Sequence, residues 1–220
     1  MWVKICGITD EEDALTAVAL GADAVGFVFA PSSRQVTVGT ARDIARRLPQ
    51  EILTVGVFRD QSTDFVIDTV LAAGLTGAQL HGHETPAMAQ EIRPKVKALF
   101  VAFAAGSPSI DRFDEYGADA LMLDAANPGS GEVFDWRIAD SRPFNRRLIL
   151  AGGLTPANVA EAITVVRPWG VDVSTGVEES PGRKDPLKMQ AFIRAARAVQ
   201  LPEHEGEGPV PFDWQESGDL

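Results

Sequence analysis

Cysteine is almost absent from this chain. Cys6 is the only one among 220 residues, so a disulfide within the chain is excluded, and with it the small disulfide-stabilised folds. This cysteine usage favours a reducing compartment such as the cytoplasm. The open question is whether the Cys6 thiol is a small buried hydrophobic group or a reactive one.

Long apolar runs are also missing. No stretch approaches the roughly 18 apolar residues that indicate a transmembrane helix, so none is predicted. The short apolar start, residues 2–8, is interrupted by Lys4 and followed at once by the acidic residues 10–13. It lacks the basic start and the longer apolar core of a secretory signal, and a cytoplasmic location is therefore expected.

Basic residues are few compared with acidic ones. The 20 Lys and Arg residues face 31 Asp and Glu residues, which gives a formal net charge of −11 and a pI near 4.7. Sequence-independent binding to nucleic acid depends on cations that neutralise phosphates, so nucleic acid is not an expected partner, and neither is an anionic membrane. The charge is consistent with an ordinary soluble protein, whose partner we expect to be a small molecule.

Eight short apolar runs rich in β-forming residues recur along the chain. Their apolarity is continuous rather than alternating, as in strands that are buried on both faces. The gaps between them are too long for hairpins but fit a crossover helix, so successive strands are predicted to be parallel. The runs begin at Trp2, Ala22, Leu53, Gly77, Val96, Ala118, Arg147 and Val171.

Several segments between the runs carry signals of a helix start. Glu12 follows Thr9 at the spacing of a capping box, and Pro156 follows Thr155 at the first helical position, where a proline costs no hydrogen bond. Helices are predicted to start at Thr9, Ser62, Thr155 and Asp185, and weaker helices are predicted over residues 107–116 and 134–140.

Eight strand and helix units without an obvious linker indicate a single (β/α)8 barrel, a TIM barrel, over residues 1–200. An open doubly wound sheet has a similar alternation of strands and helices, and the number of strands leaves that alternative open. Residues 201–220 mix proline, glycine and acidic residues with few periodic apolar positions. We predict that they form a C-terminal tail outside the barrel.

Two side chains at strand ends carry candidate chemistry. The loops after the strands form the catalytic face of such a barrel, and Cys6 ends the first run while Asp124 ends the sixth. One interpretation makes them a general base and a general acid; the other makes Cys6 a buried hydrophobic group and Asp124 a helix cap or ion-pair partner. Lys4 would point to the same face as Cys6, lower the pKa of the thiol and attract an anionic substrate.

Two small-residue loops follow the seventh and eighth runs. These loops often bind phosphate in barrels, because glycine lets backbone N–H groups approach an anion closely. Taken singly, each loop is as consistent with an ordinary turn; their adjacency in the ring favours a phosphate site. The candidate phosphate-binding residues are Gly152, Gly153, Ser174, Thr175 and Gly176.

Arg34 and His81 are predicted on the same face. The guanidinium of Arg34 suits a carboxylate, although an exposed loop arginine is an equally simple interpretation. His81 and His83 form an HxH pair, but no third ligand stands at a suitable spacing, so no metal site is predicted.

Eight motifs occur in a fixed order between Val3 and Ala198: KICGIT, GFVFAPSSR, VGVF, QLHG, LMLD, GSGEVFDW, LAGGLTPANV and VDVSTGVE. In this set and order the chain resembles the phosphoribosylanthranilate isomerase family of tryptophan biosynthesis. The resemblance implies an enzyme that needs no cofactor and performs an Amadori rearrangement on a phosphorylated substrate. N-(5-phosphoribosyl)anthranilate would become 1-(2-carboxyphenylamino)-1-deoxyribulose 5-phosphate, and the enzyme would be a monomer or a homodimer.

The same resemblance implies roles for the candidate residues. Asp124 would be the general acid that opens the furanose ring, and Cys6 the general base that removes the proton from C2 of the sugar. Arg34 would bind the anthranilate carboxylate, and Asp172 would lie near the sugar hydroxyls. The expected substrate-binding residues are Lys4, Arg34, His81 and Asp172, and the two loops named above would hold the phosphate.

Two alternatives and one departure accompany the resemblance. A bifunctional isomerase that also converts the analogous aminoaldose of histidine biosynthesis usually has an aspartate in place of Cys6 and two symmetric phosphate sites. A catalytically silent barrel that binds a phosphorylated metabolite needs neither Cys6 nor Asp124. The departure is Pro128, which stands in the loop after Asp124 where the family more often has a glycine-rich run.

Overall fold

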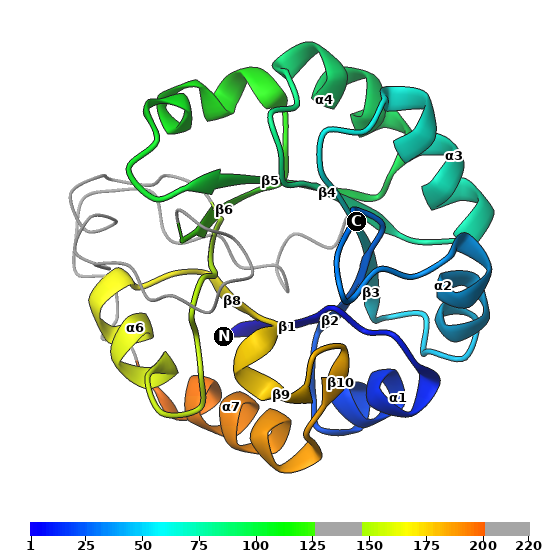
Figure 1. The fold of residues 1–220 in the computed structure, drawn as a ribbon. Coiled ribbons are helices and arrows are strands. Elements are labelled where there is room, and N and C mark those ends of the chain that lie inside the picture. The colour runs from blue at the N-terminus through cyan, green and yellow to red at the C-terminus, as the bar shows by residue number, and fades with distance from the viewer. Residues whose placement is uncertain (126–146, 201–220) are drawn as a thin grey trace.

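The computed structural model describes residues 1–125 and 147–200. Eight parallel strands follow one another in chain order, and β1 pairs with both β2 and β8 to close a barrel (Figure 1). The predicted (β/α)8 barrel is confirmed and the open sheet is wrong. Each predicted run overlaps one strand: β1 (Trp2–Cys6), β2 (Ala24–Val28), β3 (Leu53–Phe58), β4 (Gly77–Leu80), β5 (Ala98–Ala104), β6 (Ala120–Asp124), β7 (Leu148–Leu150) and β8 (Gly170–Val173).

The described helices lie in a ring outside the strands (Figure 1). The α-helices are α1 (Glu11–Ala19), α2 (Val38–Ala45), α3 (Thr63–Ala73), α4 (Pro86–Ile92), α6 (Val159–Val166) and α7 (Pro186–Ala198). Short 3₁₀ helices and a two-stranded hairpin complete the described chain: η1 (Arg93–Lys95), η2 (Pro108–Tyr116), η3 (Thr175–Val177), β9 (Glu178–Ser180) and β10 (Arg183–Lys184). The helix predicted over residues 134–140 and the tail predicted over 201–220 lie outside the described residues.

Two of the predicted helix starts are correct and one is off by a residue. Ser62 caps α3 and Asp185 caps α7, each by accepting backbone N–H groups of the first turn. At α1 the cap is Asp10, whose carboxylate accepts the N–H of Asp13 at 2.9 Å, and not Thr9. The Thr9 hydroxyl donates instead to the carbonyl of Gly182, a partner that only the folded chain supplies.

The start of α6 was also predicted too early. The helix begins at Val159 with Asn158 as its cap, so Thr155 and Pro156 precede it. The Asn158 amide accepts the N–H of Thr155 at 2.7 Å and donates to the carbonyl of Gly153 at 3.0 Å. These bonds hold residues 153–158 in a turn, and an asparagine that bonds to its own neighbouring backbone favours a turn over a helix.

The barrel interior is apolar at one end and polar at the other. Trp2 stacks on Trp169 with ring centroids 4.9 Å apart and meets Phe100 edge to face at 5.8 Å, and all three belong to or pack on the inner apolar cluster. Since these tryptophans lie at the amino-terminal ends of β1 and β8, they close the floor of the barrel. The polar interior side chains therefore gather at the carboxyl ends of the strands.

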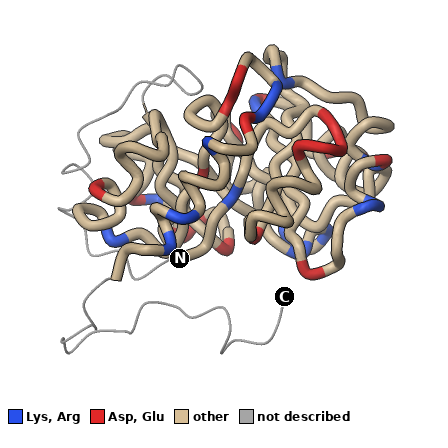
Figure 2. The backbone as a smooth tube through the Cα atoms, turned by 90° about the horizontal axis from the view of Figure 1, so that it is seen from below, with Lys and Arg blue, Asp and Glu red and all other residues tan. Residues whose placement is uncertain are grey.

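Charged residues of both signs are interspersed over the visible part of the tube in Figure 2 and do not gather in one region. Among the described residues, no helix has the length and apolarity to cross a bilayer. The η2 segment was predicted as a weak α-helix over residues 107–116, and it is a 3₁₀ helix capped by Ser107.

Two glycines in or beside helices are expected to respond to alanine with opposite signs. Gly74 ends α3 in the left-handed region with a φ of 64° and open space around a Cβ, so Gly74→Ala should cost about 1 kcal/mol of unfolding free energy through backbone strain alone. Gly39 lies inside α2 and a Cβ there would make only ordinary contact, so Gly39→Ala should add about 0.5–1 kcal/mol. Urea unfolding of both variants checks this, and equal signs would contradict it.

Candidate active site

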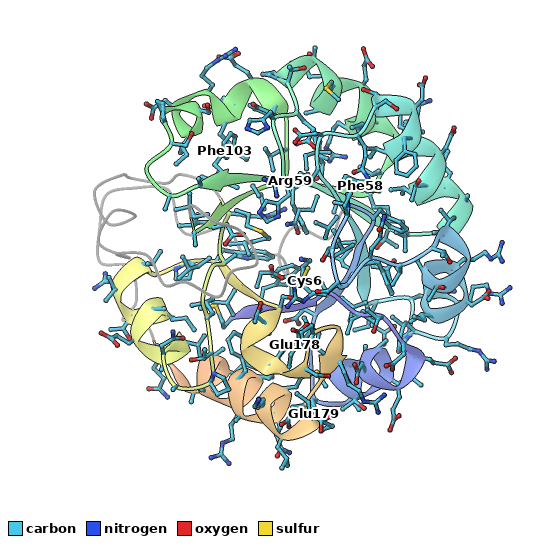
Figure 3. The ribbon with its side chains drawn as sticks, viewed as in Figure 1. Cys6, Phe58, Arg59, Phe103, Glu178 and Glu179 are labelled. Atoms are coloured by element: carbon cyan, nitrogen blue, oxygen red, sulfur yellow. The ribbon has the colours of Figure 1, made fainter. Side chains whose placement is uncertain are left out.

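Cys6 and Asp124 lie at the carboxyl ends of β1 and β6, as predicted. Both are buried, with exposed fractions of 7% and 6%. Figure 3 shows Cys6 near the centre of the ring. The barrel therefore brings one thiol and one carboxyl group, from segments far apart in sequence, to the same mouth.

Lys4 lies on the same inner face as Cys6, which confirms the prediction from strand alternation. A Cβ built on Gly26 of the neighbouring strand β2 would lie 2.8 Å from the Cys6 sulfur and 3.1 Å from the Lys4 ammonium nitrogen. Both side chains thus rest against the same glycine. A larger residue at position 26 would displace the thiol and the ammonium group together.

A chain of polar side chains crosses the barrel from β8 to β6. Lys4 Nζ lies 2.9 Å from Asp172 Oδ1 and donates to Gln79 Oε1 at 2.9 Å. Gln79 Nε2 lies 2.9 Å from His81 Nδ1. The last link is a contact: His81 Nε2 lies 2.9 Å from Asp124 Oδ2 but outside the angular range of a hydrogen bond.

The second oxygen of Asp124 is also engaged. Asp124 Oδ1 accepts the N–H of Ala125 at 2.7 Å, and a Cβ built on Gly152 would lie 2.8 Å from that oxygen. Gly152 also has a φ of 81°, which a glycine adopts without strain. The loop after β7 can therefore pack directly on Asp124 only because residue 152 has no side chain.

A second buried cation group lies on the β9–β10 hairpin. Glu178 and Arg34 form a bidentate ion pair, in which Nε and Nη2 of the guanidinium each donate to one carboxylate oxygen at 2.7 Å. Lys184, which has no exposed side-chain surface, donates to the same carboxylate at 3.0 Å and to the carbonyl of Ser174 at 3.2 Å. Figure 3 shows Glu178 on the inner side of the hairpin and Glu179 at its outer edge.

Burial and charge have opposite effects on the pKa of Cys6. Burial raises the pKa of the thiol above its ordinary value, and the positive charges of Lys4 and Lys184 offset this only in part. Lys4 does lower the pKa of the thiol, as predicted from its charge, but the loss of water around Cys6 has the larger effect and the net pKa is raised. For Lys4 itself burial would lower the pKa, but Asp172 and Cys6 outweigh burial and raise it.

The two candidate phosphate loops are in direct contact. A Cβ built on Gly176 would collide with the carbonyl oxygen of Leu154, so the loop after β8 packs against the loop after β7 without any intervening side chain. Gly153 has a φ of 66°, and Thr175 lies 3.3 Å from the Arg34 guanidinium. The two predicted loops therefore lie side by side, and Thr175 brings the loop after β8 next to Arg34.

His81 and His83 have different surroundings. His81 joins the polar chain, whereas the exposed His83 accompanies Asp60, which accepts its backbone N–H at 2.6 Å and lies 3.1 Å from its ring. In residues 1–125 and 147–200, no group of three or more His, Cys, Asp or Glu side chains is arranged to hold a metal ion. The HxH pair does not converge on one site.

Three residues at the mouth were missed in the sequence. Gln79 stands in the QLHG motif, Glu178 ends VDVSTGVE, and Lys184 follows in the segment GRKD. Glu178 and Lys184 follow the eighth strand, which is a signal of the catalytic face, whereas Gln79 is indistinguishable from any polar residue of a short strand. Gln79 is 75 residues from its partner Lys4, and Glu178 is 144 residues from its partner Arg34.

The family model of N-(5'-phosphoribosyl)anthranilate (PRA) isomerase matches residues 3–195. The chain belongs to this family. An N-(5'-phosphoribosyl)anthranilate isomerase of Desulforudis audaxviator is 51% identical to it over 199 residues, which cover 89% of this chain and 97% of the relative. The resemblance expected from the eight ordered motifs is thus confirmed.

Solved structures of the family have the same fold. The phosphoribosyl anthranilate isomerase of Thermus thermophilus is 41% identical with a TM-score of 0.84, and the match covers 91% of this chain and all of the other. A second family structure, 38% identical with a TM-score of 0.79 and coverage of 90% and 100%, was solved in complex with reduced 1-(o-carboxyphenylamino)-1-deoxyribulose 5-phosphate.

Lys184 is expected to hold down the pKa of Cys6. Lys184→Met removes one of the two cations that act on the thiol, so the pKa of Cys6 should rise further and alkylation by iodoacetamide at pH 8 should slow. Because Cys6 is the only cysteine, mass spectrometry of the alkylated protein reports on it alone.

Lys188→Met is the matched control. Lys188 is an exposed lysine of α7 that donates to the backbone carbonyl of Glu178 at 2.7 Å, and its loss should leave the pH dependence of alkylation unchanged. A Lys184→Met protein that is alkylated as fast as the wild type, or faster, would contradict the assignment.

Proposed function

We propose that Cys6 and Asp124 are the general base and the general acid of the reaction for which the family is named. The chain then converts N-(5'-phosphoribosyl)anthranilate into 1-(2-carboxyphenylamino)-1-deoxyribulose 5-phosphate in tryptophan biosynthesis. The observation that carries this proposal is the position of the thiol and the carboxyl group at the same barrel mouth, at the ends of β1 and β6. The family structure with a bound reduced form of the product supports it.

The chemistry accounts for the two residue types. Asp124 donates its proton to the furanose ring oxygen, the bond between that oxygen and C1 breaks, and the anilino nitrogen lends its electron pair to form a Schiff base. The cationic C=N bond acidifies C2, and the Cys6 thiolate takes the C2 proton while the electron pair moves toward nitrogen. The resulting enolamine tautomerises to the ketone, so the reaction is an isomerisation without net loss of atoms or electrons.

The groups around Cys6 and Asp124 stabilise the negative charges that these two residues carry during the reaction. The positive charges of Lys4 and Lys184 both stabilise the anionic form of the thiol against the effect of burial. The Ala125 N–H bonded to Asp124 Oδ1 stabilises the carboxylate that remains after proton donation. Each catalytic group therefore has a partner for its anionic form.

The proposed substrate-binding roles use the atoms of Arg34 and Asp172 that lie outside the ion pairs described above. The ion pair with Glu178 uses Nε and Nη2 of Arg34, so the anthranilate carboxylate would bind at the Nη1 edge. Asp172 is held by Lys4 through Oδ1, and its Oδ2 would accept a sugar hydroxyl. Backbone N–H groups of the loops at 152–153 and 174–176 would bind the phosphate.

Further properties remain predictions. The reaction as written needs no cofactor and no metal. A cytoplasmic location and a monomeric or homodimeric state are expected, and gel filtration coupled to light scattering measures the latter.

The loss of substrate fluorescence during turnover directly tests the proposed roles of Cys6 and Asp124. Wild-type protein should turn over N-(5'-phosphoribosyl)anthranilate, and Cys6→Ala and Asp124→Asn should each lower kcat by roughly 10²–10⁴-fold, the usual contribution of a general acid or base. Both variants should still bind product, and His83→Gln, at the exposed histidine, serves as control. Unimpaired turnover by Cys6→Ala would reject the base role. Turnover of the histidine-pathway aminoaldose would instead support the bifunctional alternative.

The pH dependence follows from the raised pKa of Cys6. The productive state needs a proton on Asp124 and none on Cys6, so the pair must hold one proton in total. Since burial raises the pKa of Cys6, that proton is lost only in the alkaline range, and kcat/KM should fall there through a pKa above the ordinary thiol value. This alkaline fall of kcat/KM should occur at the same pH as the rise in the alkylation rate of Cys6, and it should move to higher pH in Lys184→Met. A fall at a pH below the ordinary thiol pKa would contradict this account.

A further inference from the structure

Gln79 is a buried residue with no role in the chemistry above. Its exposed fraction is 1%, and it stands in the middle of β4, between Lys4 on β1 and His81 after the strand. Both ends of its amide are engaged, with Oε1 toward Lys4 and Nε2 toward His81. A buried amide with two fixed partners constrains the hydrogens of both.

Lys4 fixes which way the Gln79 amide faces. An ammonium group has only donors, so the atom 2.9 Å from Lys4 Nζ must be the carbonyl oxygen of the amide. Lys4 has no exposed surface and is also paired with Asp172. The pair keeps the lysine positively charged and keeps its ammonium group directed at Gln79. The opposite orientation would set two donors against each other inside the barrel.

The amide orientation in turn fixes the proton on His81. With Oε1 toward Lys4, the NH₂ group of Gln79 faces His81 Nδ1 at 2.9 Å. Nδ1 must then be an acceptor without a proton, and the neutral ring carries its proton on Nε2. The tautomer therefore follows from the charge of Lys4, two side chains away.

This tautomer matters because Nε2 lies 2.9 Å from Asp124 Oδ2. A bare Nε2 would attract a proton from Asp124 and withdraw it from the substrate. An Nε2 that already carries a hydrogen has no free lone pair to accept a proton from Asp124, and Oδ1 already accepts the N–H of Ala125. The acid proton on Oδ2 is then not lost to His81 and remains available to the substrate at the mouth.

We propose that Gln79 is a positioning residue that holds His81 in the Nε2–H tautomer, so that His81 cannot take the proton that Asp124 gives to the substrate. The proposal rests on Asp124 being the general acid. It adds a link between the two catalytic sides, since Lys4, which rests against Gly26 as the base Cys6 does, sets the hydrogen beside the acid.

Gln79→Glu is the decisive variant, because it keeps shape and keeps an oxygen for Lys4. The second carboxylate oxygen would accept a hydrogen from Nδ1, so His81 should gain a proton there. A ring with bare Nε2 would capture the Asp124 proton, and a doubly protonated ring would hold Asp124 as a carboxylate. In both cases kcat should fall by roughly 10- to 100-fold, part of what a general acid contributes, with KM and product affinity within a few-fold of wild type.

The tautomer itself is read by two-bond ¹H–¹⁵N correlation NMR of the imidazole rings. The chain has three histidines, His81, His83 and His204, so His83→Gln and His204→Gln assign the spectrum. Wild-type His81 should show the Nε2–H pattern, and Gln79→Glu should show a protonated Nδ1. Gln90→Glu is the control for added charge, because Gln90 is exposed on α4 and donates to the carbonyl of Glu115; it should change neither the spectrum of His81 nor kcat.

The outcomes separate this proposal from the proposed function. An Nδ1–H tautomer in the wild type overturns it, and that measurement needs no variant to fold. A Gln79→Glu protein that loses activity with the His81 tautomer unchanged, or that changes tautomer at full kcat, also overturns it. Failure of the proposed function appears elsewhere, as a wild type without turnover or an Asp124→Asn variant with full turnover.

Discussion

The Lys4–Asp172 ion pair inside the barrel is the interaction on which the site depends. A lysine without exposed surface loses its hydration and is tolerated only with a partner, here a carboxylate 2.9 Å away. The pair places a fixed positive charge beside Cys6 and a fixed donor in front of Gln79. Removing either partner would leave an isolated buried charge. The geometry of the base Cys6 and of the polar chain therefore depends on this ion pair.

The hairpin after β8 holds a second buried lysine, Lys184, that is paired with a carboxylate and acts on the thiol. Glu178 binds Arg34 and Lys184 together, and both cations outweigh burial and lower the pKa of that carboxyl group. The group links the loop after β2 to the loop after β8, where the phosphate is proposed to bind. Two lysines, each held by a carboxylate, therefore lower the pKa of the thiol, and burial still raises it above its ordinary value.

The sequence-based predictions succeeded where the signal is local. Strands, the caps Ser62 and Asp185, and the side-chain alternation of Lys4 and Cys6 all depend on neighbours within a few residues. The predicted caps Thr9 and Thr155 are wrong because each residue has another hydrogen-bond partner. The Thr9 hydroxyl donates to the carbonyl of Gly182, and the Thr155 N–H donates to the Asn158 side chain. The predicted effect of Lys4 on the pKa of Cys6 has the right direction, but the larger, opposite effect of burial could not be predicted, because burial is a property of the packed barrel.

The sequence by itself therefore determined the eight strands, the family and the two catalytic candidates, because periodicity and ordered motifs are written along the chain. Only the tertiary structure decided how Gln79 bridges Lys4 and His81, and how Glu178 and Lys184 reach Arg34 and the thiol. The physical reason is that these bonds join β-strands and loops separated by up to 168 residues, as between Lys4 and Asp172. Closing the barrel brings such residues within 3 Å of one another and removes the water that would otherwise set their charges.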